Sequence, residues 1–316
     1  MPDVLLSVEN LKKYFPTPKG VVRAVDDIGF SINRGETLGL VGESGCGKST
    51  TGRVVIRLID ATGGTVLFNG ADINKLPGRQ LKKLRRKMQI IFQDPYSSID
   101  PRKSVAQIIA KPFKVHHLGT KKEIESKVDY LMGKVGLSSR LYNKYPHELD
   151  GGRRQRVGIA RAIALDPSFI VCDEPVSALD VSIQAQILNL LQELQSTLGL
   201  TYLFISHDLS VVKHISDRVA VMYLGKIVET ARSLDLFKNP AHPYTRALLS
   251  AIPVPKLHRR NRERIILEGN VPSPIDPPPG CLFQGRCHAA MPKCREICPD
   301  LKEISPGHQV ACNLFD

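Results

Sequence analysis

The stretch Gly42-Glu43-Ser44-Gly45-Cys46-Gly47-Lys48-Ser49-Thr50 decides the fold class of this 316-residue chain. It has the pattern G-x-x-x-x-G-K-S/T, follows an apolar run that ends at Val41, and precedes a predicted helix. Glycines in such a loop let successive backbone N–H groups point at phosphate oxygens, next to the positive end of the helix. Lys48 would supply a positive charge to the β and γ phosphates, and the Ser49 hydroxyl would be a ligand of Mg²⁺. The sequence therefore predicts a nucleotide phosphate site at residues 42–50.

An acidic pair at the end of another apolar run fits the same nucleotide chemistry. The apolar run Phe169 to Cys172 ends in the pair Asp173-Glu174. Beside a phosphate loop, a strand-terminal aspartate such as Asp173 holds Mg²⁺, usually through water. Glu174 would polarise the attacking water as general base, an effect of about 10²–10⁴-fold.

The first ~240 residues alternate strand-like and helix-like runs, which predicts an α/β domain with a largely parallel sheet. Apolar residues from Ser182 to Leu198 recur at helical spacing. From Asn239 onward prolines and cysteines accumulate, which predicts a tail that needs a staple other than a hydrophobic core. The predicted strands are 37–41, 88–92, 169–172 and 202–205.

Composition narrows the class of protein. The chain carries 44 Lys+Arg against 31 Asp+Glu, a net charge of +13, and is 42% hydrophobic, as in ordinary globular domains. It shows no secretory signal and no apolar run near the ~20 residues of a membrane helix, so we expect a cytosolic protein. The positive charge concentrates in 79–87 and 256–264, which lack the interleaved aromatics of a single-strand binder. We interpret both as solvated faces, oriented toward anionic lipid headgroups, and expect no nucleic-acid partner.

Further motifs follow in the order and spacing of ATP-binding cassette (ABC) ATPases, and ~230 residues of the chain resemble that family. Gln93 is similar to the Q-loop glutamine, which senses Mg²⁺ and the attacking water, and His207 to the switch histidine, which contacts the γ-phosphate. The remaining matches are Leu149-Asp150-Gly151-Gly152-Arg153 at the signature, Ser177-Ala178-Leu179-Asp180 at the D-loop, and Tyr14 where an aromatic stacks on adenine. The resemblance implies a P-loop NTPase fold with a RecA-like core, an antiparallel β subdomain and a helical subdomain. It implies Gln93, Glu174 and His207 as catalytic residues, and Gln93 with Ser49 as Mg²⁺ ligands.

Two longer stretches narrow the resemblance to the oligopeptide/dipeptide (and nickel) importer subfamily: 92–102, and 239–249 with the tail that follows. It implies an ABC domain at 1–250, with a helical subdomain at about 96–165, and a small irregular extension at 251–316. It also implies ATP hydrolysis that powers peptide import, in an ATP sandwich with a second, non-identical ATPase. The partners would be two permease subunits, docking near Pro95 and Pro101, and indirectly a peptide-binding protein. The chain would lie peripherally on the cytoplasmic face of the cell membrane.

Asp150 departs from the family pattern, in which a signature serine donates a hydrogen bond to the γ-phosphate. Two unit charges ~4 Å apart repel by ~4 kcal/mol at an effective dielectric near 20. We therefore expect one weakened composite site, unless Asp150 is protonated or turned away.

Five cysteines crowd into the tail: Cys281, Cys287, Cys294, Cys298 and Cys312. Their spacing does not fit the paired C-x2-C of zinc ribbons, and by count four thiolates suit a 4Fe–4S cluster or Zn²⁺ equally. The local run Cys294 to Pro299 resembles the end of a ferredoxin motif and would nominate Cys298. The subfamily pattern instead implies Cys281, Cys287, Cys294 and Cys312, in a structural role.

Two other classes of function stay open on the sequence. A soluble ABC ATPase acting on nucleic acid is one, but the second cassette or long coiled coil of such proteins is missing. A non-catalytic regulatory subunit is the other, although Lys48, Asp173, Glu174 and His207 are all present. Dipeptides, longer peptides and nickel remain alternative solutes.

Overall fold

The structure is a computed structural model of the chain, and it describes residues 3–252, 265–267, 269 and 272–315. The chain divides into two compact units. The first comprises residues 1–33, 37–75 and 205–316, and the second comprises 34–36 and 76–204. The basic segment 256–264, which the sequence predicts to be a solvated face, lies outside the described residues.

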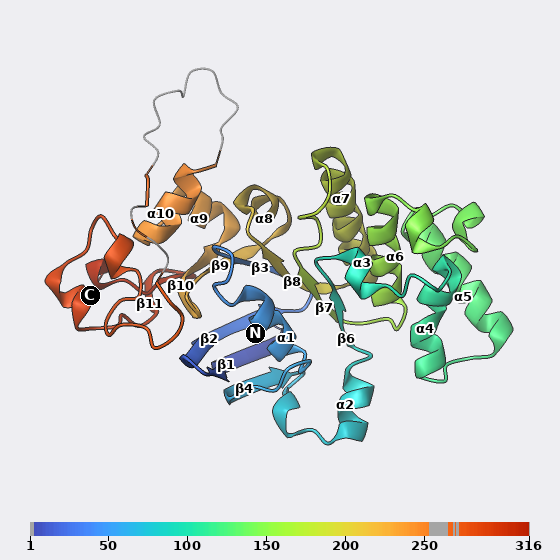
Figure 1. Cartoon of the computed structure of the whole chain (residues 1–316), viewed down its shortest axis with the longest axis horizontal. Coiled ribbons are helices and arrows are strands. Elements are labelled where there is room, and N and C mark those ends of the chain that lie inside the picture. Colours follow the sequence, from blue (N-terminus) through green and yellow to red (C-terminus); the bar gives the residue numbers. More distant parts are fainter. Residues whose placement is uncertain (1–2, 253–264, 268, 270–271, 316) are drawn as a thin grey trace, which may run out of the picture. The chain divides into compact units, whose positions relative to one another are not determined.

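The first unit contains an antiparallel sheet near the N-terminus. Its strand order is β2-β1-β4-β5, and Figure 1 shows β2, β1 and β4 side by side. The long pair formed by the first two strands carries several register shifts, and apolar side chains such as Leu6 and Ile32 are buried. The bounds are β1 Val4–Thr17, β2 Gly20–Asn33, β4 Gly63–Phe68 and β5 Ala71–Asp72.

A second group of strands in this unit runs in the order β11-β12-β10-β9-β3. The pair β3–β9 is parallel, and the other pairs are antiparallel. The strands are β3 Thr37–Val41, β9 Arg218–Tyr223, β10 Lys226–Arg232, β11 Lys302–Ser305 and β12 His308–Val310. The helices of the unit are α1 Lys48–Val55, α8 Leu209–Ile215, α9 Ser233–Lys238 and α10 Pro243–Ser250.

The C-terminal extension is therefore less irregular than the sequence suggests. It returns to the unit as a β-hairpin, in which Val310 pairs with Glu229 of β10. All four residues of β11 are exposed and only Ile304 is apolar, so hydrophobic alternation does not mark that strand.

The second unit contains strands in the order β8-β7-β6, and the pair β6–β7 is parallel. The boundary between the units falls within β8 Thr201–Ser206. The other elements are β6 Met88–Ile91, β7 Phe169–Asp173, α2 Gly78–Leu84, α3 Pro95–Ser98, α4 Val105–Val115, α5 Lys121–Lys134, α6 Gly151–Ile163 and α7 Val181–Leu198. The expected α/β fold, its four strands and the helix at 182–198 are confirmed.

Local chemistry fixes the helix starts in this unit. Ser104 and Gln107 form a capping box at α4, and Thr120 and Glu123 form one at α5. Each box satisfies two backbone N–H groups that have no partner within the helix. None of the helices in the described part of the chain combines the length and apolar character of a membrane span.

Candidate functional site

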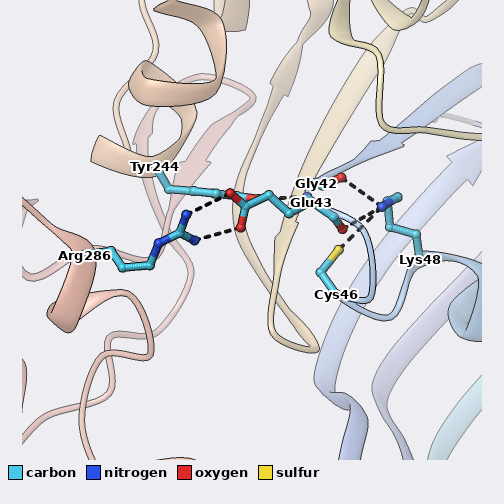
Figure 2. A network of polar contacts seen from close by, with 6 residues as sticks. All are labelled: Gly42, Glu43, Cys46, Lys48, Tyr244 and Arg286. Carbon is cyan, nitrogen blue, oxygen red and sulfur yellow. Dashed lines mark hydrogen bonds and ion pairs between the residues drawn. The ribbon is translucent and has the colours of Figure 1, made fainter. Parts of the chain in front are cut away.

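The phosphate loop connects β3, in which every residue is buried, to α1. Lys48 opens the helix and is only 4% exposed. Its Nζ donates to the carbonyl oxygens of Gly42 at 2.8 Å and Glu43 at 2.9 Å (Figure 2). The loop thus wraps around the ammonium group and fixes one positive charge at its centre.

Two glycines are required in this loop by their surroundings. Gly42 has φ +155°, and an added Cβ would lie 2.1 Å from the Met222 carbonyl oxygen. Gly47 has φ +107°, and its Cβ would lie 2.0 Å from the Ala24 carbonyl oxygen. The loop therefore passes between the backbones of β2 and β9 at a distance that excludes side chains.

The turn between β9 and β10 also holds the loop. Gly225 donates its N–H to the Cys46 carbonyl at 2.9 Å and accepts one from Asp26 N at 2.8 Å. Of the other loop residues, Ser44 and Gly45 are exposed, and Ser49 and Thr50 are half-buried.

Tyr14 lies beside this region, because it pairs in β1 with Arg23, the neighbour of Ala24. Its hydroxyl donates to the Asp26 carboxylate. Burial, and then this hydrogen bond, raise the pKa of Tyr14 to about 12, so the phenol stays neutral. The ring is half-buried, and its stacking on adenine stays a prediction. His207 follows β8 in the same unit and is exposed, and its contact with the γ-phosphate likewise stays a prediction.

In the second unit, β7 ends at Asp173, which is 1% exposed. Glu174 follows with φ +47°, a left-handed conformation that costs free energy for a residue other than glycine. Gln93, just after β6, donates its Nε2 hydrogen to Glu174 Oε2 at 3.0 Å. The structure thus brings together two of the three predicted catalytic side chains. Backbone strain such as that of the left-handed Glu174 persists where the surrounding structure demands it, often at functional sites.

The signature segment begins α6. Asp150 is the N-cap: its Oδ1 accepts the Arg153 N–H at 2.7 Å, and its Oδ2 lies 3.4 Å from Arg153 Nε. A Cβ on Gly151 would lie 3.0 Å from Leu179, and one on Gly152 would lie 2.7 Å from Ile183. The signature glycines therefore pack against the D-loop and α7. Asp180 is the N-cap position of α7 and is exposed.

The cysteine set of the extension is partly gathered. Burial raises the pKa of Cys281 to about 11, and the neighbouring Cys294, Cys312 and Cys287 add to that rise. The pKa of Cys298 is also raised by burial, but the charged groups that act on it are Lys226, Asp300 and Asp26.

The metal centre itself finds no support in this geometry. Within residues 3–252, 265–267, 269 and 272–315, no three His, Cys, Asp or Glu side chains are arranged to hold a metal ion. The predicted 4Fe–4S or Zn²⁺ site on these cysteines is therefore not supported by the structure.

Sequence reasoning missed two residues at the phosphate loop, Tyr244 and Arg286. The Tyr244 hydroxyl accepts the Glu43 N–H at 2.9 Å, and Arg286 forms an ion pair with the Glu43 carboxylate at 2.7 Å. Both lie about 200 or more residues beyond the loop, so no local spacing links them to it. The capping role of Asp150, by contrast, could have been recognised from an aspartate directly before a helix.

The sequence and the fold of this chain match known families and solved structures. The family model described as ABC transporter matches residues 25–177, and the one described as oligopeptide/dipeptide transporter, C-terminal region, matches 228–294. Among solved structures, the ATP-binding cassette MJ0796 bound to ADP and Pi superimposes with a TM-score of 0.67 at 27% identity, over 72% of this chain and 98% of that one. CbiO1 from Clostridium perfringens gives 0.67 at 30%, over 75% and 92%. The fold and the phosphate loop define an ABC ATPase, which couples ATP hydrolysis to transport.

Full-length relatives narrow the class. The oligopeptide transport ATP-binding protein AppF of Bacillus subtilis is 53% identical over 99% of this chain and 98% of its own length. OppF, an oligopeptide transport ATP-binding protein of the same organism, is 53% identical over 99% and 97%. The chain belongs to the family of ATP-binding subunits of oligopeptide/dipeptide ABC transporters.

Proposed function

We propose that this chain hydrolyses ATP to power the import of dipeptides or oligopeptides, on the cytoplasmic face of the cell membrane. The observation that carries the proposal is the match of residues 228–294 to the C-terminal region of oligopeptide/dipeptide transporters. The similarity of AppF and OppF over nearly the whole chain supports it.

Each residue of the proposed site has a separate role in ATP hydrolysis. The phosphate loop and Lys48 bind the β and γ phosphates of ATP. Ser49, Gln93 and Asp173 offer the hydroxyl, amide and carboxylate oxygens that suit Mg²⁺, which neutralises phosphate charge when bound. Glu174 takes a proton from the attacking water, and Gln93 orients the Glu174 carboxylate through the bond at 3.0 Å.

The working unit in this proposal is an ATP sandwich, with a second, non-identical ATPase that faces the signature of this chain. Asp150 would weaken the composite site to which it belongs, because its carboxylate would approach a phosphate. Replacing Asp150 with serine keeps the helix cap and removes the charge. If the reconstituted pair carrying D150S shows unchanged ATPase activity and transport, the two composite ATP sites do not differ because of Asp150.

Docking of a permease is proposed on α3 and its surroundings. Tyr96 is 61% exposed, and the Arg154 guanidinium lies 3.5 Å from its ring centroid. A large aromatic side chain held outward in this way suits an interface core. We expect Tyr96→Ala to lower peptide-stimulated ATPase in the assembled transporter while basal ATP binding stays intact.

The decisive experiment reconstitutes the chain with its permeases and second ATPase in proteoliposomes. We expect ATP-dependent uptake of labelled dipeptides or oligopeptides, which Glu174→Gln abolishes. Uptake of nickel but not of peptides would show that nickel is the solute. ATPase activity that DNA or RNA stimulates, without any uptake, would show that the chain acts on nucleic acid instead.

The metal centre of the extension stays a prediction. Iron and sulfide analysis of anaerobically purified protein, together with zinc analysis, tests it. About four iron atoms per chain, lost in a Cys281→Ser variant but kept in Cys298→Ser, would establish the four-cysteine set. One zinc per chain would assign Zn²⁺ instead, and neither metal would end the hypothesis.

A further inference from the structure

An ion pair joins the cysteine-rich extension to the phosphate loop, across 243 positions of sequence. Arg286 Nη1 donates to Glu43 Oε2 at 2.7 Å, and Nη2 donates to Oε1 at 3.0 Å (Figure 2). Two parallel bonds of this kind fix both the distance and the plane of the carboxylate. Glu43 is the second residue of the loop, so the extension contacts the loop that the ATP phosphates require.

The contact belongs to a packed structure and is not an accident of the surface. The Arg286 side chain is only 8% exposed, and its guanidinium carbon lies 6.0 Å from the Tyr223 ring centroid. Phe283 of the extension is 1% exposed, and its ring centroid lies 5.3 Å from that of Tyr223 and 5.4 Å from that of Tyr244. Aromatic packing thus places Arg286, which lies one turn beyond Phe283.

The same cluster holds Glu43 at two points. Arg286 binds its side chain, and the Tyr244 hydroxyl accepts its backbone N–H at 2.9 Å (Figure 2). The carbonyl of Glu43 in turn accepts from Lys48 Nζ. The position of Glu43 therefore helps to set where the Lys48 ammonium lies.

The charge of Glu43 needs an explanation in a loop that binds a polyanion. A free carboxylate here would repel phosphate and would also compete for Lys48. Paired with Arg286, the carboxylate is neutralised and turned toward the extension. The Glu43 carboxylate raises the pKa of Arg286 above its ordinary range, so the guanidinium keeps its positive charge.

We infer that Arg286 is a positioning residue of the ATP site, which neutralises Glu43 and holds it away from the phosphates. The cysteine-rich extension is then part of the nucleotide-binding machinery. This inference rests on the proposed function, since it requires that the loop bind ATP.

The test measures binding of the non-hydrolysable analogue AMP-PNP with Mg²⁺ to the full-length chain by calorimetry. Arg286→Gln should weaken binding at least about tenfold, which corresponds to about 1.4 kcal/mol. In the Glu43→Gln background the same change should have an effect of less than about threefold, because no carboxylate is left to neutralise. Arg295→Gln is the matched control, since Arg295 is an exposed arginine of the same extension, and it should bind as the wild type does.

A purely structural role predicts a different pattern. Arg286→Gln would then lower the melting temperature and the affinity equally with or without Glu43, and the lack of rescue would overturn the inference. If Arg286→Gln does not fold, Glu43→Gln alone decides: binding as tight as wild type supports the inference, and a loss above about threefold overturns it. Failure of the wild-type chain to bind AMP-PNP would instead refute the proposed function.

Discussion

Gln93 and Glu174 lie 81 residues apart in sequence, yet the Gln93 amide donates a hydrogen bond of 3.0 Å to the Glu174 carboxylate. The parallel pairing of β6 with β7 creates this relationship, because it aligns the ends of the two strands. Side chains that follow neighbouring parallel strands meet at the same edge of a sheet. The hydrogen bond that holds the Glu174 carboxylate is thus a consequence of topology.

The first prediction concerns this bond. Gln93→Ala should lower kcat for ATP about tenfold or more and leave KM within about threefold, because the base loses its orientation but stays in place. Steady-state phosphate release by the reconstituted transporter measures both constants. Gln89→Ala is the control: Gln89 lies on β6, the strand that Gln93 follows, and its amide donates to the Arg85 carbonyl instead. An unchanged kcat for the Gln93 variant would contradict the orienting role.

The second prediction compares two loop glycines. Gly47→Ala should lower the free energy of unfolding by more than about 3 kcal/mol, because its Cβ would meet the Ala24 carbonyl at 2.0 Å. Gly45→Ala has a positive φ too, +79°, but nothing lies within 4 Å of its Cβ. Only the conformational cost of about 1–2 kcal/mol should then appear. Urea unfolding followed by circular dichroism distinguishes the two, and equal losses would refute the close approach.

The third prediction concerns the cap at α6. Asp150→Ala should cost about 1 kcal/mol of stability, because the Arg153 N–H loses its acceptor. Asp150→Ser should stay within about 0.5 kcal/mol of wild type, since serine is an equally good N-cap. Both values come from denaturant unfolding of the isolated chain. A destabilised serine variant would mean that the carboxylate stabilises the chain through its charge rather than as a cap.

The fourth prediction concerns pH. His242 is the N-cap of α10, where its Nδ1 accepts the Tyr244 N–H at 3.0 Å. Burial, and then the nearby Arg246, lower the pKa of His242 to about 4. The folded state therefore binds fewer protons than the unfolded state between about pH 6.5 and pH 4. Stability should fall by about 3 kcal/mol as the pH decreases through that window, and should lose nothing more from this group below it.

His242→Asn tests this, because asparagine can cap the helix but does not titrate. Between pH 6.5 and pH 4, its free energy of unfolding should fall by about 3 kcal/mol less than that of the wild type. His147→Asn, at an exposed position, serves as the matched control for the substitution. An identical slope in the His242 variant would show that other groups control the acid response.

The cysteine-rich extension shows why the sequence predicted some parts of this molecule better than others. The exposed strand β11 carries no periodic apolar signal; it pairs with β12, and β12 pairs in turn with β10 of the first unit. Arg286 and Tyr244 have no motif around them, because their partner Glu43 is more than two hundred residues away. Packing of Phe283 against Tyr223 and Tyr244 brings Arg286 to the loop.

The sequence by itself determined the phosphate loop, the buried strands, the long helix α7 and the class of ABC ATPase. Short-range chemistry encodes these features: glycine spacing, apolar runs and helical periodicity act over a few residues. Only the tertiary structure decided that Gln93 holds Glu174 and that Arg286 reaches Glu43. The contacts of Gln93 and Arg286 join residues 81 and 243 positions apart, and long-range contacts arise from the packing of the whole chain rather than from any local pattern.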